Sequence, residues 1–420
     1  MCRNVVIEQF KQAVERNDPD AVRRLLHSQP LLAERINEPW FVFDTPAIVI
    51  AANRGNRELV DVLLEYGADI NVKSSWWAGG FGVLHHEHHD LSRYLIERGA
   101  HVDPHAAAAL GMLELLRKMV EQDADIVNQR GPDGQVPLHY AVSPEIIDFL
   151  LDHGAVMDMR DIDHSSTPAQ YAVNIPDKCR HLIHRGAQTD IFMACKLGDV
   201  ELVHNILKKD PDALQFQVGK GDFTSVGGHI YEYVIGANVK PIFLAQHLGH
   251  EAITELMLSY SSVEQKFLLA CIRADTETVR NILKEHPDIV QFLQPEDQSV
   301  IIDAARDHNA DAVRLMLDVG FHVDARRNER SMTALHRAAE RGDYEIVRLL
   351  IKHGASLEIR NEFGGTPMNS CIWGSLHTQD PQGDYAAVAE ILIEAGVKLP
   401  DQAMGSEPVR NVLIRHGVRE

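Results

Sequence analysis

The residues best able to do chemistry lie in the segment 85–90, which reads HHEHHD. If this segment is helical, spacings of three and four residues place His85, His88 and His89 on one face. Three neutral imidazoles on one face could hold Zn²⁺ or Ni²⁺. The segment lacks the H-E-x-x-H order, however, because the residue four after its second histidine is Asp90. The alternative, which we favour over a metal site, is a solvated helix face that titrates near neutral pH.

A cysteine and a histidine further along the chain, Cys371 and His377, could act as a nucleophile and its base. No oxyanion donor or third residue accompanies them, so we favour a buried structural cysteine. The sequence also lacks a phosphate-binding loop, a G-x-S-x-G elbow, a dinucleotide fingerprint and carboxylates at a recognisable catalytic spacing. We therefore favour a protein without enzymatic activity, with an enzyme as the alternative, and we expect no cofactor.

Large aromatic residues occupy the segment 74–84, SSWWAGGFGVL, where a short polar loop would be ordinary. Trp76, Trp77 and Phe81 are either a hydrophobic plug over the neighbouring helices or anchors for a partner. Anchors are plausible because Trp is enriched among the residues that dominate binding energy at interfaces. Trp373, which precedes a long loop, is a further candidate contact.

An insertion at 219–239 interrupts the regular pattern of the chain. Within it His229, Tyr231 and Tyr233 alternate with residues of the opposite face, and this period of two predicts an extended hairpin-like arm. Insertions of this length are uncommon in a compact array unless they have a use, so we expect the arm to contact a ligand. The alternative is an ordinary extended finger.

Composition and charge restrict the partners. The net charge is −20, from 61 acidic and 41 basic residues, which disfavours nucleic acid and anionic membranes and favours a basic protein or peptide. The five cysteines are scattered, and no apolar stretch reaches the ~18 residues of a membrane span. These features predict a cytoplasmic protein with reduced thiols and no contact with a membrane.

One segment displays the elements that must position these side chains. Residues 333–358 read TALHRAAERGDYEIVRLLIKHGASLE, with apolar residues at helical spacing in two stretches. Gly342 separates the stretches and Gly354 follows the second, and glycine readily takes the left-handed conformation that stops a helix. The segment therefore predicts two short helices joined by a tight turn.

This pattern resembles the ankyrin repeat, with its T-P-L-H opening, A-A-x-x-G middle and G-A-D ending. A second good copy runs from Thr45 to Asp69, and glycines that end repeats recur every 32 to 34 residues, as from Gly67 to Gly99. Partial copies begin at Val136, Thr167, Pro241 and Thr366. The Trp76-Trp77 insertion is similar to insertions in bacterial ankyrin proteins.

The resemblance implies an all-α ankyrin-repeat solenoid of about twelve helix-turn-helix units, with short β-hairpin fingers and one longer hairpin-like insertion. The expected ranges form one continuous solenoid. They are a capping repeat at 1–36, repeats at 37–218, the arm at 219–239, repeats at 240–398 and a capping half-repeat at 399–420.

The resemblance also implies binding as the function, and three hypotheses follow. The leading one is a scaffold that holds a protein or peptide in an acidic concave groove lined by aromatic fingers. Its expected contacts are Trp76, Trp77, Phe81, His229, Tyr231, Tyr233 and Trp373. The alternative is a metal-dependent enzyme or small-molecule binder with its site near residues 85–89 and the arm. A third is a regulator whose His-rich face acts as a pH-sensitive latch.

Overall fold

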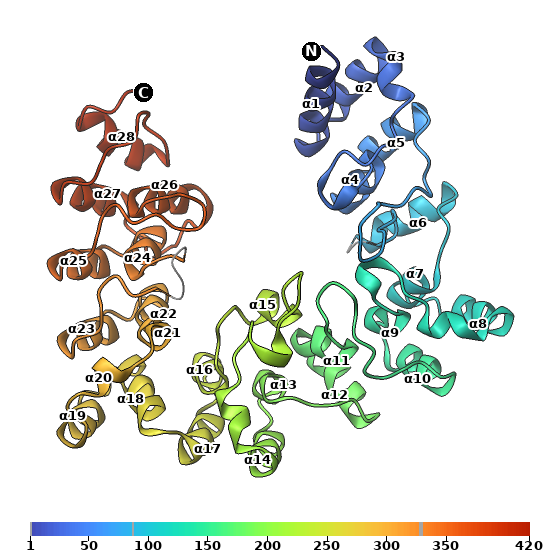
Figure 1. Cartoon of the computed structure of the whole chain (residues 1–420). Coiled ribbons are helices and arrows are strands. Elements are labelled where there is room, and N and C mark those ends of the chain that lie inside the picture. Colours follow the sequence, from blue (N-terminus) through green and yellow to red (C-terminus); the bar gives the residue numbers. More distant parts are fainter. Residues whose placement is uncertain (1, 86–87, 327–330) are drawn as a thin grey trace. The chain divides into compact units, whose positions relative to one another are not determined.

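Short helices joined by tight turns and longer loops build the chain, in a computed structural model that describes residues 2–85, 88–326 and 331–420 (Figure 1). The chain divides into two compact units, Met1–Thr254 and Glu255–Glu420, and each is described by itself. The repeat ranges expected from the sequence, and their union in one continuous solenoid, stay predictions.

In the first unit the helices form two rows. The inner row includes α7, α9 and α11, which pack on one another in that order, and the outer row includes α10 and α12. The α-helices of this unit are α1 (Cys2–Glu15), α2 (Pro19–Ser28), α3 (Pro30–Ala33), α4 (Ala47–Asn53), α5 (Arg57–Glu65), α6 (His89–Glu97), α7 (Pro104–Ala109), α8 (Leu113–Gln122), α9 (Pro137–Tyr140), α10 (Pro144–Asp152), α11 (Pro168–Tyr171), α12 (Pro176–His184), α13 (Ile191–Leu197), α14 (Val200–Lys209), α15 (Ile230–Val234) and α16 (Pro241–His247). Its 3-10 helices are η1 (Val42–Asp44), η2 (Ala124–Asn128), η3 (Pro132–Gly134), η4 (Ala172–Asn174), η5 (Pro211–Gln215) and η6 (Gly221–Phe223).

The second unit repeats this arrangement. Helix α24 packs between α22 and α26, and α25 packs between α23 and α27, so inner and outer helices stack in parallel rows (Figure 1). The helices are α18 (Val263–Ile272), α19 (Thr276–Glu285), α20 (Ile289–Phe292), α21 (Pro295–Gln298), α22 (Val300–Arg306), α23 (Ala310–Asp318), α24 (Ala334–Arg341), α25 (Tyr344–Lys352), α26 (Pro367–His377), α27 (Tyr385–Glu394) and α28 (Glu407–Arg415). Helix α17 (Glu251–Tyr260) contains the boundary between the two units.

The regular repeat at 333–358 forms as its sequence predicts. Thr333 caps the N-terminus of α24 by accepting the backbone N–H of His336, and Asp343 caps α25 in the same way through Ile346. Gly342 ends α24 in the left-handed conformation at φ 70°. His336 Nε2 donates to the carbonyl of Gly365 at 3.1 Å, which fixes this repeat to the loop of the next one.

Two expectations about extended structure are corrected. Over residues 2–85, 88–326 and 331–420 the fingers contain no strand, and their β pairing is limited to two isolated bridges, Phe41 with Thr45 and Gln402 with Arg419. The arm at 219–239 is not a hairpin either. It carries the short helices η6 and α15, and His229 caps α15 by accepting the backbone N–H of Tyr231.

Candidate functional site

The second unit contains a groove of about 800 Å³ between the loop at 360–365 and the inner helices α24 and α26. Two large aromatic side chains border it and face solvent, Phe363 at 81% exposed and Trp373 at 52%. The remaining lining residues are Met332, Arg337, Glu340, Arg360, Asn361, Glu362, Gly364, Gly365, Asn369 and Ser370. The groove therefore offers both apolar surface and hydrogen-bonding groups to a ligand.

Local hydrogen bonds shape the loop on one side of this groove. The side-chain oxygen of Asn361 accepts the backbone N–H of Phe363 at 3.1 Å and of Gly365 at 2.9 Å. Gly364 lies in the left-handed region at φ 76° and completes the turn. The turn leaves Phe363 at its tip with its ring in solvent.

A glycine sets the separation of the two helices that form the groove floor. A Cβ on Gly374 of α26 would lie 2.1 Å from the carbonyl oxygen of Glu340 in α24. The two helices therefore approach more closely than any larger residue at 374 permits. Trp373, the preceding residue, is carried to the edge of the groove, where its ring lies 4.9 Å from that of His377.

Charges of both signs line the groove. Arg337 pairs with Glu340 at 2.7 Å, and Arg360 donates to the carbonyl of Gly364 at 2.6 Å. With Glu362, the lining residues that the structure describes include two cationic and two anionic side chains. These four side chains balance in charge, and the expectation of an acidic concave groove along the repeats stays a prediction.

The aromatic segment at 74–84 forms a second cluster, in the first unit. The Trp76 ring is half-buried and lies 4.9 Å from Phe43 and 5.9 Å from Trp77. Trp77 is 57% exposed, whereas Phe81 is partly buried and its backbone pairs with Ser74. Trp76 is thus the packed member of the cluster, and Trp77 is the member that a partner can reach.

Two of the expected arm contacts are buried. His229 and Tyr231 are both 0% exposed, and burial lowers the pKa of His229 to about 4. Tyr231 stacks on Phe223 and donates to the Asp190 carboxylate, so it anchors the arm to the repeats. Only Tyr233, at 67% exposed, presents a surface from this group. Sequence periodicity had assigned all three to one accessible face.

The His-rich segment does not form the expected helical face. Helix α6 begins only at His89, so His85 precedes it by a turn and points elsewhere. His85 Nε2 donates to Asp103 at 3.1 Å and its Nδ1 accepts the backbone N–H of Gly82, which leaves neither nitrogen for a metal. His88 Nε2 lies 3.1 Å from the carbonyl of Asn53. The side chain of His89 and residues 86–87 lie outside the described residues.

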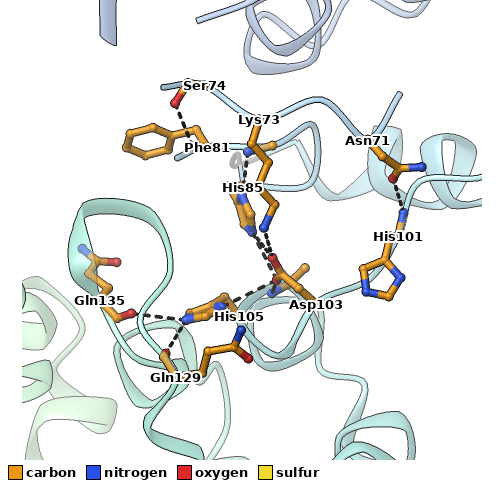
Figure 2. A network of polar contacts seen from close by, with 12 residues as sticks. Asn71, Lys73, Ser74, Phe81, His85, His101, Asp103, His105, Gln129 and Gln135 are labelled. Atoms are coloured by element: carbon orange, nitrogen blue, oxygen red, sulfur yellow. Dashed lines mark hydrogen bonds and ion pairs between the residues drawn. The ribbon is translucent and has the colours of Figure 1, made fainter. Parts of the chain in front are cut away.

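A single carboxylate organises the region around His85 (Figure 2). Asp103 caps α7 through the backbone N–H of Ala106 and also lies 3.0 Å from Lys73 and 3.7 Å from His105. Burial raises the pKa of Asp103, but the close approach of His105 and the hydrogen bond and charge of His85 outweigh it and hold the pKa far below its usual range. The His-rich segment thus contributes a structural ion-pair network that joins the finger to α7.

The four cysteines whose side chains the structure describes are buried. Cys179, Cys195, Cys271 and Cys371 are each buried as free thiols. Burial raises the pKa of Cys371 to about 12, so it carries no thiolate near neutral pH. The nucleophile hypothesis for Cys371 and His377 is therefore wrong, and the structural reading holds.

Comparison with known proteins agrees with this architecture. Family models for ankyrin repeats match residues 104–193 and 267–361, and a single-repeat model matches 44–75, together about half of the chain. The chain belongs to the ankyrin-repeat family. Ankyrin repeats generally mediate protein–protein interaction, through the extended surfaces that stacked repeats create.

Curated relatives are similar over part of their length. The ankyrin repeat protein FPV018 of fowlpox virus is 23% identical, over 59% of this chain and 37% of the relative. The E3 ubiquitin-protein ligase KEG of Arabidopsis thaliana is 25% identical, over 62% of this chain and 17% of the relative. The B-cell lymphoma 3 protein homolog of Mus musculus is 26% identical, over 56% of this chain and 48% of the relative. The chain thus spans less than half the length of each. The solved ankyrin repeat domain of human ASB11 matches 70% of this chain and 98% of that domain, with 19% identity and a TM-score of 0.26.

Within the described part of the chain, no helix combines the length and the apolar character needed to cross a membrane.

Proposed function

We propose that the chain binds a protein or peptide segment in the groove between the loop at 360–365 and helix α26. The observation that carries the proposal is the pair of exposed aromatic side chains, Phe363 and Trp373, on the border of a cavity of about 800 Å³. Exposed aromatic residues beside a concave surface are typical of the few residues that dominate binding energy at protein interfaces.

The chemistry of the groove favours a peptide with an apolar anchor and polar neighbours. Phe363 and Trp373 supply apolar surface, whereas Arg337, Glu340 and Asn369 supply hydrogen-bonding groups on the floor. The net charge of −20 attracts basic partners at long range, and the mixed charges of the groove then set the orientation at short range.

Trp77 and Tyr233 are the proposed contacts of a second surface in the first unit, since both side chains are more than half exposed. Trp76 and Phe81 support this surface from beneath. His229 and Tyr231 hold the arm in place and have no direct role in partner binding.

Selection of peptides from a display library on the immobilised full chain tests the proposal. Peptides selected by the wild type should lose at least about tenfold in affinity with Trp373→Ala and with Phe363→Ala, as expected for hot-spot residues. Phe292→Ala is the matched control, because Phe292 is 76% exposed in the same unit and does not line the groove.

Equal affinity of all three variants would contradict the proposed groove. Loss only with Trp77→Ala and Tyr233→Ala would move the binding site to the first unit. Circular dichroism of each variant should match the wild type, since the substituted side chains are exposed.

A further inference from the structure

Three side chains with metal-ligating atoms meet where two finger loops of the first unit face the insertion arm. Asp133 lies in η3, and Asp163 and His164 lie in the loop between α10 and α11. One ligand atom from each residue lies within 4.8 Å of the other two. Within the described part of the chain, these are the side chains of histidine, cysteine, aspartate or glutamate that come together as a group of three with the spacing to hold a metal ion.

The hydrogen bond of His164 leaves a free nitrogen that faces this cluster. Its Nδ1 lies 2.7 Å from the carbonyl oxygen of Gly228 in the arm, which can only accept, so Nδ1 carries the proton. When the ring is neutral, Nε2 offers its lone pair, and it lies 3.7 Å from the Asp163 carboxylate. Histidine ligands of metals commonly have this arrangement, with the second nitrogen donating to a backbone carbonyl.

One oxygen of the buried Asp163 carboxylate has no hydrogen-bond partner. Asp163 is 6% exposed, and its Oδ1 accepts no hydrogen bond. Asp161, two residues earlier, accepts from the backbone N–H groups of Ser166 and His164 and from the phenol of Tyr171. The loop therefore satisfies both oxygens of Asp161, whereas Asp163 keeps Oδ1 without a hydrogen-bond partner and places Oδ2 3.7 Å from His164.

Asp133 adds a second carboxylate at close range. It lies in η3, and one of its carboxylate oxygens lies within 4.8 Å of a ligand atom of Asp163 and of His164. The ligand atoms of two carboxylates and one imidazole thus lie close to one another. A cation removes the repulsion between all three groups.

We propose that Asp133, Asp163 and His164 bind one Zn²⁺ ion, and that this ion fixes the insertion arm onto the finger loops. Imidazole with two carboxylates suits zinc, and its bond lengths of about 2.0–2.2 Å require the ligand atoms to draw together by about 1 Å. The arm closes on the same residues, because Ser225 donates to the carbonyl of Asp163 at 2.9 Å. The role is structural, and no reaction follows from it.

The test uses the full chain, purified without a histidine tag, stripped with a chelator and then titrated with Zn²⁺ against a chromophoric chelator. We expect one zinc-binding site in the wild type that is at least about 100-fold weaker in Asp163→Asn and in His164→Gln, a larger loss than removal of an outer partner causes. Other histidines of the chain can bind zinc in the wild type and in both variants alike. The result to compare is therefore the one equivalent of zinc by which the wild type exceeds each variant.

Asp222→Asn is the matched control, because it removes an exposed acidic group from the same arm. It should bind zinc as the wild type does. Equal zinc affinity of the wild type, Asp163→Asn and His164→Gln, or no binding by the wild type, would overturn the proposal.

Thermal melting and proteolysis provide a second readout that does not depend on counting zinc. In chelator the Asp163→Asn variant should melt at or above the wild-type temperature, because one of two neighbouring carboxylates is gone. His164→Gln also removes the ring that donates to the carbonyl of Gly228, so its melting temperature in chelator is the baseline only for its own response to Zn²⁺. Zn²⁺ should raise the melting temperature and slow cleavage within 219–239 in the wild type and Asp222→Asn alone. Protection by Mg²⁺ but not by Zn²⁺ would overturn the assignment of the metal.

Discussion

The phenol of Tyr231 donates a hydrogen bond of 2.8 Å to the carboxylate of Asp190, the residue that caps helix α13. The same carboxylate accepts from Gln170 at 3.1 Å and from the backbone N–H of Met193 at 2.9 Å. Burial raises the pKa of Asp190, and these three hydrogen bonds oppose that rise. A residue of the insertion thereby completes the cap of a repeat helix, so the arm is part of the folded unit.

Removal of the Tyr231 hydroxyl should destabilise the chain. Tyr231→Phe keeps the buried ring but withdraws a donor from Asp190, and we expect a loss of about 1–3 kcal/mol in the free energy of unfolding, measured with urea. Tyr233→Phe is the control, since Tyr233 is 67% exposed and should lose less than about 0.5 kcal/mol. Equal losses in the two variants would contradict the anchoring role of Tyr231.

The two neighbouring tryptophans should respond differently to substitution. Trp76→Ala removes a ring that packs against Phe43, and we expect a loss of about 1–3 kcal/mol and a lower melting temperature. Trp77→Ala should change stability by less than about 0.5 kcal/mol, because that side chain is 57% exposed. A reversed order of melting temperatures would show that Trp77 is the plug.

Alanine at Gly374 should destabilise the second unit although alanine is the better helix former. Helix propensity alone predicts a gain of about 1 kcal/mol. The added Cβ, however, would lie 2.1 Å from the carbonyl oxygen of Glu340, and forcing α24 and α26 apart should cost about 1–3 kcal/mol more than is gained. Urea unfolding of Gly374→Ala and of Leu376→Ala, an exposed position on the same helix, gives the comparison. A more stable Gly374→Ala would refute the close approach.

Stability should fall above neutral pH because of one histidine in the second unit. His308 lies 2.7 Å from Asp343 and 3.0 Å from Asp380. Burial lowers its pKa, but the hydrogen bonds to Asp380 and Asp343 outweigh burial and raise the pKa above 6.5. The contribution of His308 is therefore complete below about pH 6.5 and is lost as pH rises through the raised folded-state pKa.

His308→Asn isolates this contribution. Asparagine tolerates the left-handed backbone of this residue, which has φ 56°, and does not titrate. The difference in unfolding free energy between wild type and variant should shrink by less than about 1 kcal/mol from pH 6 to pH 8.5, a modest amount because the ring is partly solvated. A difference that is constant over this range would rule out the raised pKa.

Local sequence signals predicted the parts of the fold that are themselves local. The caps at Thr333 and Asp343 and the stop at Gly342 act within a few residues, so the regular repeat could be predicted in full. Trp373 was predicted as a contact for the same reason, since its departure from the repeat pattern is visible in sequence. That Phe363 lines the same groove depends on how α26 and the loop at 360–365 fold relative to each other.

The sequence predictions that were wrong concern residues whose structure depends on contacts between distant segments. The alternation of His229, Tyr231 and Tyr233 predicted an extended arm, but burial of Tyr231 against the repeats selects a helix instead. The His-rich segment was assigned to one helix, whereas Asp103 draws His85 away from it. The cluster of Asp133, Asp163 and His164 joins two loops that no sequence period relates.

Because each unit contains buried thiols, the rate of thiol alkylation can report local opening in each unit separately. Cys179 and Cys195 lie in the first unit and Cys271 and Cys371 in the second, and all four are buried with raised pKa values. An alkylating reagent can react with such a thiol only while the surrounding helices are transiently apart, so the labelling rate measures how often that happens. Peptide mass spectrometry of a labelled sample would therefore rank the repeats by how readily they come apart, with no substitution anywhere in the chain.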